Sequence, residues 1–75
     1  MTQTPTEAAG ANIRAEMARR GITQVQLADH LRLPQGQVSR RLRGLIPFNI
    51  NELVAIAEFL GVDLAVLMPQ ERAAS

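Results

Sequence analysis

Several residue types are absent or scarce in this sequence of 75 residues, and each absence excludes a class of protein. Without cysteine there are no disulfide bonds or thiolate metal sites, and His30 has no second histidine with which to hold a metal ion. With two phenylalanines and no Trp or Tyr, the chain lacks the aromatic platforms that stack single-stranded bases. No apolar run approaches the roughly 18 residues of a membrane span, and residues 1–10 lack the features of a secretory signal. We therefore expect a small cytoplasmic protein with one domain and no membrane segment.

The positive charge of the chain is concentrated in one segment. The net charge is only +1, and all eight basic residues are arginine. Residues 30–51 contain no acidic residue and four arginines, so they carry +4, whereas the rest of the chain has four arginines against seven acids. Such a concentration is typical of a phosphate-binding surface, although a solvated basic helix face has the same composition.

Capping residues and apolar spacing predict helices throughout, with no strand and no internal repeat. Residues 1–8 are polar and are expected to form a flexible N-terminal arm. A first helix is predicted over residues 9–20. Thr23 and Gln26 have the spacing of a capping box, so a second helix begins directly after Thr23, at Gln24.

Three more helices are predicted in the second half. Pro34 disfavours helix before it and is accepted in a first turn, so a third helix runs over residues 35–43. Asn49 and Glu52 form a weaker capping box for a fourth helix, and a short fifth helix follows over residues 64–68. Residues 9–69 are expected to form the domain and residues 70–75 a frayed tail.

Apolar residues at helical spacing define an inner side for each helix. The predicted core contains Ile13, Met17, Leu27, Ala28, Leu31, Val38, Leu42, Leu53, Ile56, Ala57, Leu60 and Met68. Val54, Phe59 and Val66 fall outside this pattern. They form either a surface for self-association through the last two helices or simply an apolar part of the surface.

The connection between the second and third helices has only about three residues. So short a turn sets two helices at a steep angle, which is the helix-turn-helix arrangement. Val38 and Leu42 face inward, and a helix held in this way with one side exposed fits the major groove. Glutamine can pair with adenine and arginine with guanine. The polar and basic outer side of the third helix carries Gly36, Gln37, Arg40 and Arg43, with Arg41 at its flank.

Three stretches carry a family resemblance: Gly21-Ile22-Thr23-Gln24 with Leu27-Ala28, Gln37-Val38-Ser39-Arg40-Arg41-Leu42, and Leu60-Gly61-Val62. Through them, residues 13–68 resemble the helix-turn-helix domain of phage repressors, Cro proteins and their XRE-like bacterial relatives. The sequence is also similar in style to immunity repressors of actinobacterial phages. The resemblance implies an all-α, five-helix lambda-repressor-like bundle without enzymatic activity or cofactor. It also implies a homodimer on a palindromic double-stranded DNA operator, in a bacterial cell or a phage-infected host.

The resemblance also implies roles for single residues. Gln24 stands where the family often has a glutamine that contacts phosphate and braces the next helix, and Gln35 stands where it often reads a base. Arg43 aligns with a position that commonly touches phosphate. The predicted DNA-binding set is Gln24, Gln35, Gly36, Gln37, Ser39, Arg40, Arg41 and Arg43.

The chain departs from the family at three positions. Arg32 stands where the family usually has a glycine in the turn, and a left-handed arginine there costs on the order of 1 kcal/mol. Pro34 replaces a Ser or Thr cap, so one capping bond is lost. Arg41 replaces a hydrophobic residue. Both Arg32 and Arg41 can either contact DNA or lie with their stems over the core.

A sequence-specific transcriptional regulator, of the phage-repressor type, is the leading functional prediction. The alternative is an antitoxin or adaptor that uses the same bundle, with Val54 and Phe59, to bind a protein partner. No grouping of Ser, His and Asp and no phosphate-cradling glycine loop supports an enzyme. No metal and no small-molecule ligand are expected.

Overall fold

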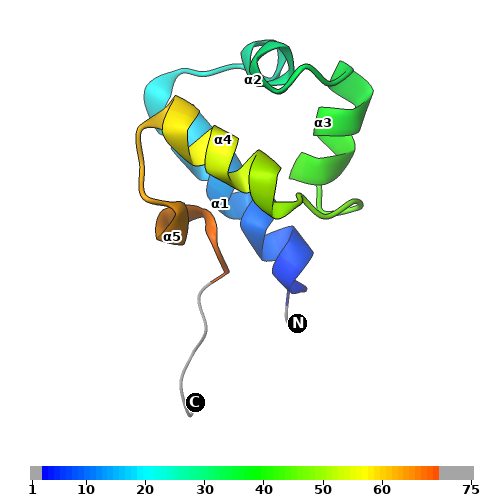
Figure 1. The fold of residues 1–75 in the computed structure, drawn as a ribbon. Coiled ribbons are helices and arrows are strands. Elements are labelled where there is room, and N and C mark those ends of the chain that lie inside the picture. The colour runs from blue at the N-terminus through cyan, green and yellow to red at the C-terminus, as the bar shows by residue number, and fades with distance from the viewer. Residues whose placement is uncertain (1–2, 70–75) are drawn as a thin grey trace.

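The computed structural model describes residues 3–69, which form five α-helices and no strand (Figure 1). They are α1 (Pro5–Arg20), α2 (Gln24–Leu31), α3 (Gln35–Leu42), α4 (Ile50–Leu60) and α5 (Leu64–Leu67). The all-α, five-helix prediction is therefore confirmed. The predicted tail, residues 70–75, lies outside the described residues. No helix within residues 3–69 is long and apolar enough to cross a membrane.

The first helix begins at Pro5, four residues earlier than predicted. Thr4 and Glu7 form a capping box, in which the Glu7 amide donates to Thr4 Oγ1 at 3.1 Å and the Thr4 amide donates to Glu7 Oε1 at 2.9 Å. The ring of Pro5 suits a first helical turn, where no intrahelical partner exists for its missing N–H. The predicted start at residue 9 is therefore wrong, and residues 5–8 belong to α1 and not to an arm.

The starts of α2 and α4 are confirmed together with their caps. Thr23 and Gln26 make both bonds of a capping box before α2, and Asn49 and Glu52 do the same before α4. Asp63 occupies the corresponding position before α5, but its side chain makes no capping bond. The predicted helices are thus reproduced with small changes at their ends, since α3 and α5 each end one residue earlier than expected.

One apolar core joins all five helices. Its fully buried side chains are Ile13, Leu27, Val38, Ile56 and Leu67. The predicted core is confirmed with two changes at its edges. Leu31 is only partly buried, and Met68 is 37% exposed because the backbone leaves the helix there in an extended conformation. Leu67, and not Met68, is the fully buried residue at this end of the chain.

The N-terminal half of α1 lies against the C-terminal end of α3. A Cβ atom on Gly10 would stand 2.4 Å from the carbonyl oxygen of Leu42, so only glycine allows this approach. The chain leaves α3 through Gly44, where φ is +82° and a Cβ would stand 2.6 Å from Cγ of Glu7. Together these contacts determine where α3 lies on the bundle.

Candidate nucleic-acid interface

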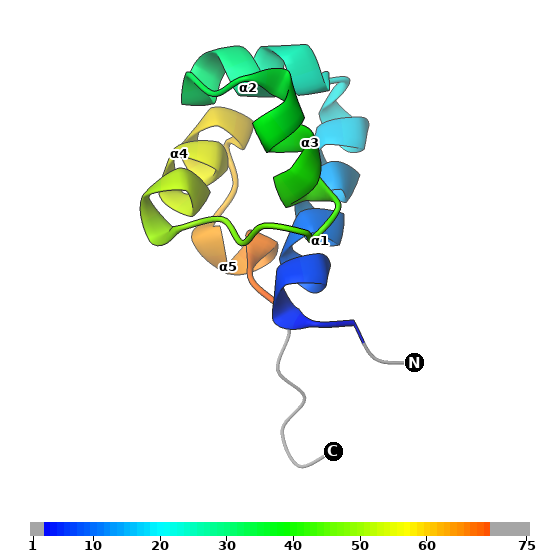
Figure 2. The same ribbon diagram turned by 90° about the vertical axis from the view of Figure 1, so that its right-hand side faces the viewer.

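The turn between α2 and α3 contains a left-handed arginine. Arg32 has φ 58° and ψ 42°, as its place in the turn predicts, and it is the one non-glycine residue with positive φ among those described. The amide of Arg32 donates to the carbonyl of Asp29 at 3.2 Å, and the amide of Leu33 donates to the carbonyl of Ala28 at 3.1 Å. The chain thus changes direction within three residues, and α3 runs down from the end of α2 (Figure 2).

The N-terminus of α3 has a backbone cap and a side-chain brace. Pro34 makes no side-chain cap bond, as expected, and its carbonyl accepts from the amides of Gln37 and Val38. Nε2 of Gln24 donates to the carbonyl of Gln35 at 3.5 Å. Gln24 therefore links the first residue of α2 to the first residue of α3, so the two N-termini are held next to each other.

The outer side of α3 is open to solvent. Gln35, Gly36, Arg40 and Arg43 are all exposed, whereas Val38 and Leu42 are buried beneath them. Figure 2 shows α3 at the front of the bundle, where no other helix covers it. Within residues 3–69 neither Arg40 nor Arg43 forms an ion pair. Two arginines without acidic partners in the described part of the chain therefore lie on, and directly after, the helix that can enter a groove.

Arg41 is held at the flank of α3. Its Nε donates to Oε1 of Glu52 at 3.2 Å, and its Nη1 donates to the carbonyl and to Oε1 of Gln37 at 3.1 and 3.0 Å. The Arg41 side chain is only 15% exposed. Gln37 and Ser39 are half-buried on the two flanks of the helix. The eight predicted residues therefore do not form one surface, because Arg41 is engaged with the protein.

Glu52 and Arg14 contribute contacts that the sequence analysis did not assign. Glu52 was predicted only as a capping residue, and it also binds Arg41. Nη1 of Arg14 donates to the carbonyl of Leu42 at 2.7 Å. No spacing rule pairs residues on different helices, so the sequence contains no signal for either contact.

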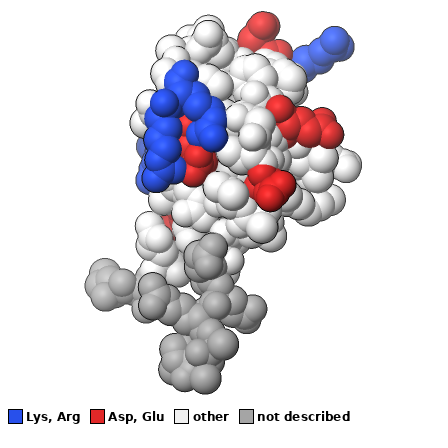
Figure 3. All heavy atoms as spheres, turned by 90° about the vertical axis from the view of Figure 1, so that its left-hand side faces the viewer, with Lys and Arg blue, Asp and Glu red and all other residues white. Residues whose placement is uncertain are grey.

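Several other charges lie away from α3 or are paired. Figure 3 views the molecule from the side opposite α3 and shows several separate acidic side chains. Arg19 and Arg20 both form ion pairs with Glu16. The hydrogen bond from Arg20 lowers the pKa of Glu16, and Arg19 adds to this effect, while burial opposes it. Arg19 and Arg20 at the end of α1 thus share an acidic partner, in contrast to the arginines on the outer side of α3.

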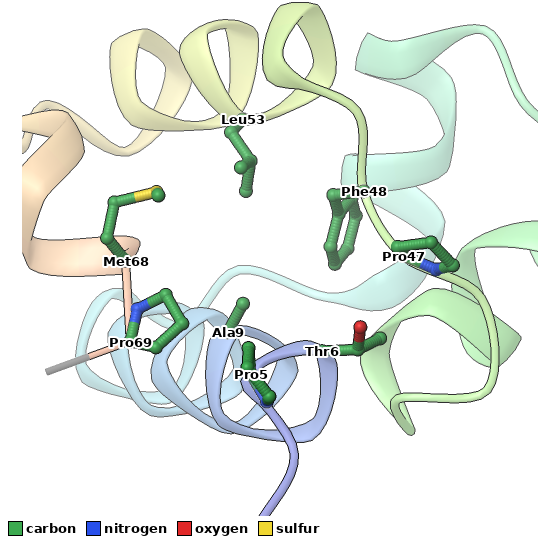
Figure 4. Close-up of a pocket in the computed structure, with 8 residues that line it drawn as sticks. All are labelled: Pro5, Thr6, Ala9, Pro47, Phe48, Leu53, Met68 and Pro69. Atoms are coloured by element: carbon green, nitrogen blue, oxygen red, sulfur yellow. The ribbon is translucent and has the colours of Figure 1, made fainter. Parts of the chain in front are cut away.

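A pocket of about 180 Å³ lies between α1, the start of α4 and the segment after α5 (Figure 4). Thr6 is the one polar side chain in its lining, which otherwise consists of Pro5, Ala9, Pro47, Phe48, Leu53, Met68 and Pro69. The pocket has no charged side chain to orient a ligand, and it does not include any residue of α3.

The sequence model of the helix-turn-helix family matches residues 13–67. The chain belongs to this family. It is a DNA-binding transcription regulator of the Cro/C1 type. The search of curated protein sequences gives no match for this helix-turn-helix regulator.

Several solved structures with the same fold are regulators. The helix-turn-helix regulator is 29% identical to the clp gene regulator ClgR from Corynebacterium glutamicum, with a TM-score of 0.81 over 88% of this chain and 86% of ClgR. The DNA-binding domain of BldD is 24% identical, with a TM-score of 0.76 over 92% of this chain and all of that domain. The restriction-modification controller protein C.AhdI from Aeromonas hydrophila is 21% identical, with a TM-score of 0.76 over 84% of this chain and 96% of C.AhdI. At 24% and 21% identity, the BldD domain and C.AhdI show a similarity of fold alone.

Proposed function

We propose that this regulator binds a specific double-stranded DNA operator by placing α3 in the major groove, and that it represses transcription in the manner of phage repressors. The observation that carries the proposal is the exposed outer side of α3, where Arg40 and Arg43 have no acidic partner among residues 3–69. An α-helix fits the width of the major groove, and the side chains at its outer side reach base edges there.

The exposed residues divide by position into two roles. Arg40 lies on the middle of the outer side, where its guanidinium can pair with O6 and N7 of guanine. Gln35 lies at the N-terminal end of α3, from which recognition helices contact bases. Arg43 follows the last residue of α3, and a cation there is suited to a phosphate, which carries no sequence information. Gln24 can touch a phosphate while it braces Gln35.

Repression by such a protein requires no chemistry on DNA, because the bound protein occludes the polymerase. A homodimer would place two copies of α3 about 34 Å apart, in successive turns of the major groove. The proposed dimer surface is on α4 and α5, where Val54 and Val66 are 40% and 41% exposed.

The same two side chains favour the second candidate, a protein-binding module of the antitoxin or adaptor type. Phe59 contributes less to either surface than predicted, because it is half-buried and stacks on His30 with ring centroids 4.2 Å apart.

Selection from randomised DNA, followed by mobility-shift titration, tests the proposal. We expect a palindromic consensus. Arg40→Ala should weaken binding to that sequence by about 1–3 kcal/mol and relax specificity at one position. Arg43→Ala should weaken binding to the consensus and to random DNA alike. If about four to six phosphates are contacted per subunit, log K should fall with log salt by about 0.9 for each.

Arg19→Ala is the matched control, because Arg19 already pairs with Glu16 on α1 and should leave DNA affinity unchanged. Equal affinity of the unmodified protein for the selected sequence and for random DNA contradicts the proposal. Binding that survives the joint loss of Arg40 and Arg43 favours the protein-binding module instead.

A further inference from the structure

Gln37 has an amide group whose two ends have different surroundings. Its Oε1 accepts a hydrogen bond of 3.0 Å from Nη1 of Arg41, one helical turn along α3. Its Nε2 donates to no group within residues 3–69. No buried side-chain nitrogen or oxygen in this part of the chain lacks a partner, so the Nε2 atom is not fully buried.

The chemistry of Arg41 determines which end of the amide faces it. A guanidinium group has N–H donors and no acceptor, so it can bind the amide oxygen but not the amide nitrogen. Nε2 lies on the other branch of the amide from Oε1, and it therefore points away from Arg41. The same Nη1 atom also donates to the main-chain carbonyl of Gln37 at 3.1 Å, which holds the guanidinium close to this residue.

Arg41 is itself fixed to α4. Its Nε donates to Oε1 of Glu52 at 3.2 Å, and the same oxygen accepts from the amide of Asn49 at 3.0 Å. The side chains of Arg41 and Glu52 are 15% and 16% exposed. An ion pair with so little exposure is screened less by salt than a surface pair. The Gln37 amide is therefore connected through two side chains to the capped N-terminus of α4.

We infer that Arg41 is a positioning residue that turns the Gln37 amide so that it presents only N–H donors to the major groove. A glutamine that makes a bidentate contact with adenine accepts from the N6 amino group with its oxygen and donates to N7 with its nitrogen. With the oxygen turned to Arg41, that pairing is lost. Nε2 alone can still reach N7 of adenine, but the edges that offer only acceptors are O6 with N7 of guanine and O4 of thymine, and these match it best. This inference rests on the proposed function and specifies a base preference within it.

The inference is tested by the base preference at the operator position that Gln37 reads. That position is identified first, as the one whose preference disappears when Gln37→Ala is selected against randomised DNA. The unmodified protein should prefer guanine or thymine there by about tenfold over adenine. Arg41→Met removes the donors and keeps a similar stem, so the amide can turn and the preference should move toward adenine. Arg41→Lys keeps a group with donors only and should retain the original preference.

Gln37→Glu provides a test that does not depend on Arg41→Met being folded. One carboxylate oxygen can bind Arg41 while the other presents an acceptor to the groove. The preference should then move to a base with an amino donor, such as cytosine. Arg19→Met, an arginine on α1 paired with Glu16, is the matched control and should give the consensus of the unmodified protein.

The possible outcomes separate the inference from the proposed function. A protein that selects no sequence contradicts both. A clear consensus with adenine at the position of Gln37, or with no position that depends on Gln37, overturns the inference alone. So does a preference for guanine or thymine that is unchanged in both Arg41→Met and Gln37→Glu.

Discussion

Arg14 on α1 and Leu42 at the end of α3 are joined by a hydrogen bond of 2.7 Å from Nη1 to the carbonyl oxygen. This carbonyl belongs to the last turn of α3, where carbonyl groups have no partner within the helix. A cation at a helix C-terminus is also favoured by the helix dipole. The same oxygen lies against Gly10, so α1 holds the end of the recognition helix through two contacts.

Loss of this bond should destabilise the fold. Arg14→Met keeps most of the stem and removes the donor, and we expect the free energy of unfolding to fall by about 1–2 kcal/mol. Urea denaturation followed by circular dichroism measures the change. Arg19→Met is the control, because the Arg19 side chain is 66% exposed and a surface ion pair such as the one with Glu16 should contribute little to stability. Equal losses in the two variants would contradict a special role for Arg14.

Two glycines should respond oppositely to alanine. In Gly10→Ala the new Cβ would meet the Leu42 carbonyl oxygen at 2.4 Å, and the cost of about 1–3 kcal/mol should exceed the gain in helix propensity of about 1 kcal/mol. In Gly36→Ala the nearest atom is Nη1 of Arg40 at 3.6 Å, an ordinary contact, so this variant should be unchanged or more stable. Thermal unfolding distinguishes the two. A stabilised Gly10→Ala variant would show that α1 and α3 are not in close contact.

Gly36→Ala should also separate stability from DNA binding. Gly36 is exposed in the first turn of α3, where the proposed docking brings the backbone close to DNA. We expect a weaker affinity for the selected operator in a protein that is at least as stable as the original. Mobility-shift titration of the same preparations measures the affinity. An unchanged affinity would mean that the backbone at Gly36 does not approach the duplex closely.

Glycine at position 32 should stabilise the turn between α2 and α3. Arg32 is held at φ 58°, which disfavours a side chain, so Arg32→Gly should stabilise the protein by up to about 1 kcal/mol. Gly61→Ala is the converse experiment at a helix end with φ 74° and open space around it, and it should destabilise by about 1 kcal/mol. Chemical denaturation measures both. A loss of stability in Arg32→Gly would indicate that the arginine side chain contributes more than its backbone conformation costs.

Glu16 should make stability depend on pH in a known direction. Its pKa in the folded protein lies below the ordinary value of 4.5, chiefly because Arg20 donates to its carboxylate. A lowered pKa means that the stabilising contribution is present above 4.5 and is lost as the pH falls through the folded value. Between about pH 6 and about pH 3, the original protein should therefore lose more stability than Glu16→Gln. Glu58→Gln, at an exposed position without an ion pair in residues 3–69, should behave like the original protein.

Local rules were sufficient for the helices and for the direction of the recognition helix. Helix starts are marked by two capping boxes, Thr23 with Gln26 and Asn49 with Glu52. The two hydrogen bonds of a capping box always join residues three positions apart, so the sequence alone reveals them. The inward positions of Val38 and Leu42 follow from the helical repeat, and so does the exposure of Arg40 and Arg43. The capping box of Thr4 and Glu7 obeys the same spacing rule, so the sequence also contains the signal for the start of α1 at Pro5.

The contacts between helices did not follow from the sequence. Arg41 was placed among the DNA contacts because its flank of α3 is polar, but α4 brings Glu52 within 3.2 Å of it. The need for glycine at position 10 depends on the end of α3, which lies against it. Leu67 is buried in place of Met68 because the backbone is extended at Met68. The physical reason is the same in each case. Bonds within a helix depend on sequence spacing, whereas bonds between helices depend on how the helices are rotated and packed, which the whole core determines at once.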